Sequence, residues 1–354
     1  MIDIDNVLTK ARMKSFIFAV SFIVFSSLAH AQSGISITAV GDIMMGTDFP
    51  TDRLPSDKGG SLFKYSAERI SAGDIRFGNF EGTFFDGNRG AGSKSPGPNR
   101  YIFRTPTDFG PALAAAGFNV VSLANNHAMD FGSQGLGATK ATLTKNQIQF
   151  SSKNGGEVAQ FNVRGIRVAL IATDFYNGAR SITTPQTTYL EIAELKKTYD
   201  IVIVSCHAGR EGAGAERTRD VAEIFSGENR GNSVEFSRKA IDAGASLIIM
   251  HGPHVPRGYE VYKGHLIAYS LGNFLTEAGI SVTGISGLAP LLQVNLDAQG
   301  KFVRGYVTSF RQVRDKGTVY DSSQAAYTFM KDLSLRDFPG SAPRFEKDGL
   351  FYPQ

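Results

Sequence analysis

The sequence predicts an α/β fold, a layered sandwich of mixed sheets flanked by helices. Short apolar segments with the composition of buried strands alternate along the chain with segments of helical period. Tight turns between paired strand segments indicate hairpins, and hairpins favour mixed rather than purely parallel sheets. Polar residues follow the ends of these strands, where ligand sites form in α/β sheets.

The strand predictions rest on apolar composition and on alternation. Residues 35–40 alternate apolar and polar side chains and run into Gly41 and Asp42, which is typical of a strand that enters a loop. Residues 74–79 repeat this pattern. The other predicted strands are continuous apolar runs, as expected for buried strands, at 119–123, 201–206 and 246–250.

The helix predictions rest on caps, stops and periodicity. Thr107 and Asp108 supply N-cap side chains for a short helix that Gly117 ends. The segment 232–243 is amphipathic and is also followed by a glycine. Helical period predicts two further helices at 135–147 and 187–198.

Hairpins and loops account for most of the remaining chain. The predicted hairpins lie at 158–173, 258–273 and 291–310. The Gly-, Ser- and Pro-rich segment 87–99 predicts a mobile surface loop. Residues 316–354 show no strong pattern, and we expect them to be an extension that packs on the domain formed by residues 32–315.

The composition excludes several classes of protein. The 354 residues are 42% hydrophobic and 20% charged, which excludes a coiled coil, a collagen-like fibre and a mostly disordered chain. A single Cys, Cys206, excludes a disulfide framework, and its place beside His207 on a strand predicts that it points into the core. The net charge of +4 comes from scattered Lys and Arg residues, so we expect a solvated surface and no nucleic-acid interface.

The N-terminal segment has the three parts of a secretory signal peptide. Basic residues within 10–14 precede the apolar run 16–28, and Ala-His-Ala follows at 29–31. This pattern predicts a signal peptide over residues 1–31, cleavage before Gln32, and a secreted or periplasmic protein without stable membrane insertion. The alternative is an uncleaved anchor, but the apolar run is short for a membrane span.

Polar side chains recur where the predicted strands end. They are Asp42, Asn79 with Glu81, Asn126 with His127, His207 and His251, and His254 follows closely. Because strand ends meet at one edge of an α/β sheet, we expect these groups to lie near one another. Oxygen and imidazole ligands without thiolates suit Mn²⁺, Zn²⁺ or Fe, bound as one or two ions. A His outside the ligand shell would protonate a leaving group.

Each of these features also has a purely structural explanation. Asp42 is compatible with a plain turn, Asn125 with a helix cap, and His207 with a satisfied core residue. The segment 251–254 is compatible with a rigid loop. Recurrence at several strand ends favours a shared site over these explanations. His265 lies in a predicted hairpin turn, where we expect it to be solvated.

The same residues, in the same order, resemble the CapA family, the capsule synthesis proteins of the poly-γ-glutamate type. The resemblance runs from about Ile35 to Phe310. The matching stretches are 38–44, 78–82, 115–130, 207–211, 251–255 and 269–274. The resemblance implies a metallophosphatase-like fold.

The resemblance also implies a role for each candidate residue. Asp42 and Glu81 would be carboxylate ligands of a divalent metal ion. His127 would be the general acid, with Asp130 as the residue that orients it. The other implied metal ligands are Asn126, His207, His251 and His254. The residues expected to bind substrate are Asn79, Asn125, Glu211 and Asn273.

Two positions depart from the metallophosphatase pattern. Met44 stands where that pattern has a His two residues after the first Asp, and Asn79 stands where it has a bridging Asp. An amide bridges two cations poorly, so either Glu81 substitutes or one ion is lost. The conservative expectation is one ion, held by Asn126, His207 and His251.

Three functional hypotheses follow. The first is a secreted hydrolase that uses a metal-bound hydroxide on an anionic polymer or a phosphoester. The amide carbonyl of a γ-linked glutamate polymer is also chemically open to such attack. The second is a non-catalytic polyanion-binding protein that assists the assembly or export of a capsule polymer. The third is structural reuse of the fold without metal or ligand.

Overall fold

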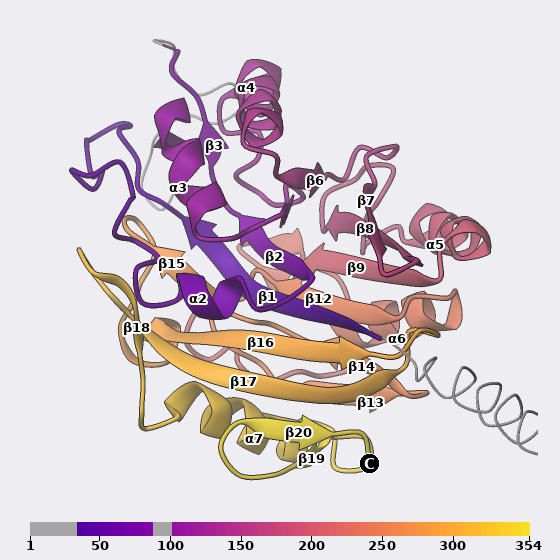
Figure 1. Ribbon diagram of the computed structural model, residues 1–354. Helices are drawn as coiled ribbons and strands as arrows, with labels where there is room; N and C mark the ends of the chain where they lie inside the picture. The colour runs from indigo at the N-terminus through magenta and orange to yellow at the C-terminus, as the bar shows by residue number, and fades with distance from the viewer. Residues whose placement is uncertain (1–33, 88–100) are drawn as a thin grey trace, which may run out of the picture. The chain divides into compact units, whose positions relative to one another are not determined.

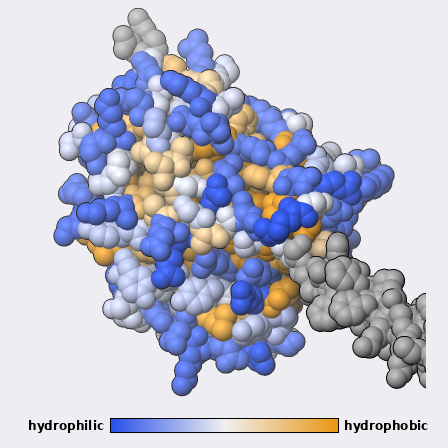
Figure 2. Space-filling view, viewed as in Figure 1, coloured by the Kyte–Doolittle hydropathy of each residue, from blue (hydrophilic) through white to orange (hydrophobic). Residues whose placement is uncertain are grey.

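The computed structural model describes residues 34–87 and 101–354. The predicted signal peptide, residues 1–31, lies outside the described residues, as does almost all of the predicted loop 87–99. Within the described ranges, no helix combines the length and the apolar composition that a membrane crossing requires. Hydrophilic residues cover most of the face seen in Figure 2, which agrees with the scattered charges of the sequence.

Two large mixed sheets form the centre of the fold (Figure 1). The first has the order β19-β20-β17-β16-β1-β2-β5-β6, with β15 beside β1 and β18 beside β17. Its strands are β1 (Ile35–Met44), β2 (Ile75–Phe80), β5 (Val120–Ser122), β6 (Gln149–Ser151), β15 (Asn273–Thr276), β16 (Leu288–Leu296), β17 (Phe302–Val313), β18 (Gly317–Tyr320), β19 (Arg344–Phe345) and β20 (Leu350–Tyr352).

The second sheet has the order β13-β14-β12-β9-β8-β7. Its strands are β7 (Ala159–Val163), β8 (Ile166–Asp174), β9 (Ile201–His207), β12 (Leu247–His251), β13 (Tyr259–Tyr262) and β14 (His265–Ala268). Two short ribbons lie outside these sheets. They are β3 (Thr83–Phe84) with β4 (Arg104–Thr105), and β10 (Ile224–Phe225) with β11 (Glu228–Asn229).

Helices cover the outer faces of both sheets. On the first sheet they are α2 (Ala67–Ile70), α3 (Gly110–Ala115) and α4 (Gly132–Lys145), with the 3-10 turn η1 (Thr107–Phe109). On the second sheet they are α5 (Gln186–Thr198) and α6 (Ser233–Asp242). The remaining elements are α7 (Ala325–Asp337) and the 3-10 turn η2 (Gly284–Gly287).

The hydrophobic core follows these layers. One cluster lies between the two sheets, because it joins side chains of β1 and β2 to side chains of β8, β9 and β12. A second cluster packs α2, α3 and α4 onto the first sheet, and a third packs α5 and α6 onto the second. The predicted layered α/β sandwich flanked by helices is therefore confirmed.

Most predicted elements are present, with small shifts at their ends. The side chain of Asn232 accepts hydrogen bonds from the backbone of Val234 and Glu235 and so caps α6, whereas no side-chain cap is formed at η1 or α3, where Thr107 and Asp108 were expected to supply one. The hairpin predicted at 158–173 is formed by β7 and β8. Cys206 is fully buried in the cluster under α5 and α6, which confirms its core position.

Three expectations were wrong in detail. The strand predicted at 35–40 continues to Met44, and Asp42 lies inside it at an irregularity of the pairing rather than in a loop. The hairpin predicted at 258–273 ends earlier, because β15 leaves it and pairs in parallel with β1 of the other sheet. His265 is half-buried rather than solvated. Its Nδ1 lies 3.1 Å from the carbonyl oxygen of Ser246.

The C-terminal segment has regular structure that the sequence pattern does not reveal. Strand β18 pairs with β17, and β20 pairs with both β17 and β19. Tyr327 and Met330 of α7 are buried in the cluster between the sheets. Residues after 316 thus extend the first sheet and close part of the core.

The parallel strands set the position of the candidate site. Strands β1, β2 and β5 are parallel neighbours in the first sheet, and β8, β9 and β12 are parallel neighbours in the second. Their carboxyl ends carry most of the polar residues that the sequence singles out. Both sheets therefore contribute side chains to one buried centre.

Candidate metal centre

Asp42 is at the middle of the centre. It lies in β1, where the pairing register shifts between Asp42 and Ile43, and its side chain is fully buried. The two neighbouring strands place Asn79 and Asn273 directly beside it in register. A bulge at this point turns the carboxylate toward the space between the two sheets.

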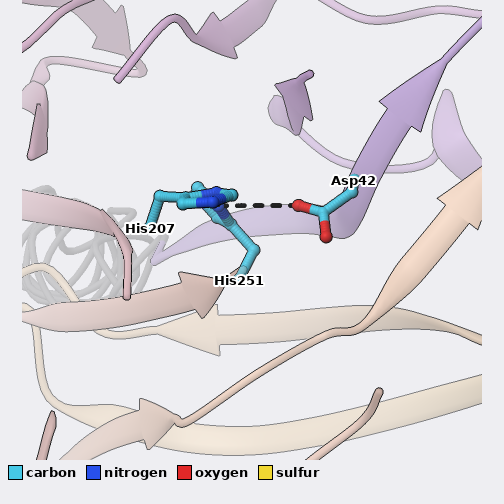
Figure 3. Close-up of side chains that lie close together, drawn as sticks. All are labelled: Asp42, His207 and His251. Atoms are coloured by element: carbon cyan, nitrogen blue, oxygen red, sulfur yellow. Dashed lines mark hydrogen bonds and ion pairs between the residues drawn. The ribbon is translucent and has the colours of Figure 1, made fainter. Parts of the chain in front are cut away.

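A first ligand triad joins Asp42 to His207 and His251, as Figure 3 shows. The two histidines end β9 and β12 and are register partners, so both imidazoles reach the same space. Their Nδ1 atoms are 3.1 Å apart, and His251 Nδ1 lies 3.6 Å from Asp42 Oδ1. One potential ligand atom from each residue lies within 4.8 Å of the others.

A second triad shares the same carboxylate and consists of Asp42, Glu81 and His254. His254 Nδ1 lies 3.1 Å from Asp42 Oδ2 and 3.7 Å from Glu81 Oε2. His254 has a positive φ of 57°, a backbone conformation that is strained for a side chain of this size. Asn273 holds this conformation, because its Oδ1 faces His254 Nδ1 at 2.9 Å and its Nδ2 donates to the His254 carbonyl at 3.1 Å.

Burial sets the protonation of the histidines. Burial lowers the pKa of His251 to about 4, and burial together with His251 holds the pKa of His207 well below its usual value. Both imidazoles are therefore neutral at pH 7, which is the form that binds a metal ion. Burial also disfavours the charged form of His254, but Glu81 and Asp42 outweigh it and raise its pKa to about 10, so an ion in the second triad would have to displace a proton from this imidazole.

These groups fit a divalent cation. Buried carboxylates are normally paired or bound to metal, and the ion-pair partners of Asp42 among the described residues are histidines rather than Lys or Arg. His207 Nε2 is buried and has no hydrogen-bond partner within that part of the chain. A donor set of imidazole nitrogens and carboxylate oxygens matches Mn²⁺, Zn²⁺ or Fe.

Ser205 orients one of the imidazoles. Its Oγ lies 2.8 Å from His251 Nε2. In the tautomer that leaves Nδ1 available to a metal ion, His251 carries its proton on Nε2 and donates it to Ser205. Such outer hydrogen bonds fix the orientation of metal-binding imidazoles.

A chain of amide hydrogen bonds links Asp42 to His127. Asn79 Nδ2 donates to Asp42 Oδ1 at 2.8 Å, and Asn125 Nδ2 donates to Asn79 Oδ1 at 3.0 Å. The backbone N–H of His127 then donates to Asn125 Oδ1 at 3.0 Å. Asn79 and Asn125, both expected to bind substrate, are thus engaged in positioning neighbouring residues.

His127 and Asp130 form a buried pair beside the triads. His127 Nδ1 lies 2.8 Å from Asp130 Oδ2, which also accepts a hydrogen bond from the backbone N–H of Phe103. The ring of Phe103 packs against the imidazole, with the centroids 4.4 Å apart. This arrangement fixes the imidazole plane and engages Nδ1, rather than Nε2, with Asp130.

Two predicted residues remain, Glu211 and Asn126. Glu211 Oε2 is 4.0 Å from His254 Nε2, and Glu211 also pairs with Arg230. Asn126 lies between Asn125 and His127 in the sequence, and it is half-buried. Its role as a ligand stays a prediction.

Sequence reasoning missed Ser205 and Phe103, and it did not mark Asp174, a buried strand-end carboxylate that belongs to neither triad. Asp174 ends β8 as the register partner of His207, and it is fully buried. The same strand-end rule finds Asp174 if the strand is extended by one residue. Ser205 is two residues before His207, so strand alternation places both on one face. No local signal marks Phe103, because its contact with Asp130 depends on the tertiary fold.

Comparison with known proteins identifies the family. The sequence model described as "Bacterial capsule synthesis protein PGA_cap" matches residues 36–278. The chain belongs to this family. The matched range contains both triads, the pair His127–Asp130 and Asn273.

Two curated relatives and one solved structure extend the comparison. The PGA biosynthesis protein CapA of Bacillus subtilis (strain 168) is 30% identical over 277 residues, which are 73% of this chain and 68% of that protein. The capsule biosynthesis protein CapA of Bacillus anthracis is 28% identical over 337 residues, 85% of this chain and 77% of that protein. The 5'-nucleotidase precursor from Thermus thermophilus is similar over 78% of this chain and 54% of that chain, at 15% identity and a TM-score of 0.39.

Proposed function

We propose that the chain is a secreted or periplasmic metal-dependent hydrolase that acts on an anionic polymer or a phosphoester in capsule polymer metabolism. One observation carries this proposal. Asp42 belongs to two ligand triads, and a hydrogen-bond chain joins it to the buried pair His127–Asp130.

Each residue then has a defined task. His207, His251 and Asp42 hold one divalent ion, and Asp42, Glu81 and His254 hold a second. When bound, such ions supply Lewis-acid polarisation of the substrate and activation of water. His127 gives a proton from Nε2 to the leaving group, and Asp130 keeps its imidazole oriented through Nδ1.

The family and the relatives support the polymer part of the proposal. The chain belongs to a capsule synthesis family, and the Bacillus subtilis relative is named for PGA biosynthesis. The signal-peptide pattern of residues 1–31 supports export. An ester of phosphate and a γ-linked amide are both compatible with attack by activated water.

Metal content and turnover test the proposal together. The purified protein is analysed for Mn, Zn and Fe, and is then assayed on p-nitrophenyl phosphate and on a γ-linked glutamate oligomer before and after chelation. We expect two ions for each chain once both triads are loaded, and turnover that depends on them. His127→Ala should lower turnover by roughly 10²- to 10⁴-fold while metal content is kept.

His265→Ala is the matched control, because His265 is a half-buried histidine whose hydrogen bonds lie outside the centre. It should leave both metal content and turnover unchanged. A protein that binds no metal after supplementation with Mn²⁺ and Zn²⁺ would contradict the proposal, and so would full turnover in His127→Ala.

A second candidate function is polyanion binding without catalysis. One observation favours it. Met44, at the position where metallophosphatases carry a His, packs in a small apolar cluster with Phe103 and Ala278 and offers no strong ligand. This alternative predicts that polymer binding persists in chelated protein and that no hydrolysis is detected with any metal.

A further inference from the structure

A cavity opens in the long loop between β9 and α6. Its volume is about 440 Å³. The side chains that matter for its chemistry are three arginines, Arg210, Arg217 and Arg219, and the apolar residues Val221, Ile224 and Phe225. A volume of this size is within the usual range for small-ligand sites.

A buried ion pair makes the wall of this cavity rigid. Glu223 accepts two hydrogen bonds from the guanidinium of Arg257, at 2.7 and 2.8 Å, and a third from the backbone N–H of Arg210 at 3.0 Å. Arg257 is fully buried, and its Nε donates to the carbonyl of Ala215 at 2.8 Å. These contacts fix the positions of Arg210, Ala215 and Glu223, three residues that line the cavity.

The same loop is attached to the metal centre. The backbone N–H of Gly212 donates to the carbonyl of Pro253, the residue before His254, at 2.8 Å. Glu211, next to Arg210, lies 4.0 Å from His254. The loop that lines the cavity is thus joined to the segment that carries His254.

The acidic and the basic side chains of this loop differ in whether they have polar or ion-pair partners. Its carboxylates already have partners, in the pairs Glu211–Arg230, Glu228–Arg230, Glu223–Arg257, Asp220–Asn232 and Glu216–Gly214. Arg217 pairs with Asp337 of α7. Arg210 and Arg219 are exposed and form no ion pair with any residue of 34–87 or 101–354.

We propose that this cavity is a binding subsite for an extended acidic chain, whose carboxylate groups pair with Arg210 and Arg219. The inference rests on the proposed function, because it supplies a substrate subsite for that metal centre. A guanidinium matches a carboxylate in a two-point hydrogen-bonded geometry. Val221 and Ile224 are 54% and 56% exposed, and they offer apolar contacts to the methylene groups between the charges of such a chain.

Binding without metal tests the subsite separately from catalysis. The full chain is treated with chelator, and the anisotropy of a fluorescein-labelled γ-linked glutamate decamer is measured at low salt. We expect the double variant Arg210→Ala/Arg219→Ala to raise the Kd by roughly four- to a hundredfold, since each exposed charge contact is worth on the order of two- to tenfold. An unlabelled decamer should compete with the label far better than inorganic phosphate does.

The matched control removes two exposed cations elsewhere. Arg69→Ala/Lys145→Ala makes the same change in net charge, on α2 and α4, and should leave the Kd within about twofold. Metal content and turnover of p-nitrophenyl phosphate should be normal in the Arg210→Ala/Arg219→Ala variant. Those two readouts distinguish a failed subsite from a failed metal centre.

Several results would overturn the subsite. They are no binding of the decamer by the chelated wild-type protein, an unchanged Kd in the Arg210→Ala/Arg219→Ala variant, and equal weakening in the control variant. Displacement of the decamer by inorganic phosphate at the same concentration would also overturn it, because the ligand would then be a single oxyanion rather than a chain.

Discussion

Asp42→Asn removes a carboxylate that both ligand triads share, and so it should affect both metal ions at once. The two oxygens of Asp42 face different partners. Oδ1 lies 3.6 Å from His251 Nδ1, and Oδ2 lies 3.1 Å from His254 Nδ1. An amide keeps the shape of the side chain but removes its charge. The other two ligands of each triad remain in place.

The size of the effect follows from the loss of one charge. Two unit charges about 4 Å apart attract by about 4 kcal/mol at an effective dielectric constant of about 20. That energy corresponds to roughly a thousandfold in affinity, and a divalent ion feels a larger change. Each ion should therefore bind at least about a thousandfold more weakly in Asp42→Asn.

The assay is metal stoichiometry after dialysis against micromolar Mn²⁺ or Zn²⁺, measured by inductively coupled plasma mass spectrometry. We expect two ions for each wild-type chain, about one for His251→Ala or Glu81→Gln, and close to none for Asp42→Asn. Asp174→Asn is the matched control, because it neutralises a carboxylate that is equally buried, ends a neighbouring strand and belongs to neither triad.

Two ions retained by Asp42→Asn would refute the shared-ligand reasoning. Equal loss of metal in Asp174→Asn would do the same, since it would trace the effect to general disruption of the strand ends. Thermal unfolding of each variant shows whether the fold survives the substitution.

Three further predictions concern orientation, pH and packing. Ser205→Ala should weaken metal binding roughly tenfold in a chelator competition, because it removes the hydrogen bond that orients an imidazole. Hydrogen bonds from Arg164 lower the pKa of Asp74 to about 2, so the charged form of Asp74 stabilises the fold above about pH 4, and this contribution is lost as pH falls through 2. Because Arg164 is 49% exposed, Asp74→Asn should cost only about 1 kcal/mol in urea unfolding at pH 7, and the difference from wild type should shrink below pH 3. Gly41→Ala would place Cβ 1.9 Å from the carbonyl oxygen of Gly272. The melting temperature of this variant should therefore fall by several degrees or more. An unchanged melting temperature would refute the close contact.

The sequence predicts much of the centre because the relevant rule is local. A polar residue after an apolar strand marks the carboxyl end of that strand, and parallel neighbours bring such ends to one edge. His207 and His251 meet in this way, as register partners at the ends of β9 and β12. Asp42 and Asn79 are register partners in the same manner.

The parts that the sequence does not predict depend on contacts between distant segments. Strand β15 pairs with β1 in the first sheet, although it follows the β13–β14 hairpin of the second sheet. Nothing in the run 269–276 distinguishes this pairing from a continued hairpin. The shared position of Asp42 also requires both sheets, since His251 comes from one and Glu81 follows a strand of the other. The buried ion pair between Glu223 and Arg257 joins the loop to the segment that follows His254, and these two segments are distant in the sequence.

The amide of Asn79 faces the carboxylate that the two candidate triads share. Asn79 Nδ2 donates to Asp42 Oδ1 at 2.8 Å, so a hydrogen-bond donor faces the shared carboxylate. An aspartate there would place two anionic oxygens at a similar distance, and their repulsion would raise the pKa of one of the two carboxyl groups. With the amide, Asp42 keeps its orientation through a hydrogen bond alone, and Asn125 in turn holds Asn79. If both triads hold an ion, Asp42 would be the carboxylate common to the two sites, and Glu81 would be the second carboxylate of the centre.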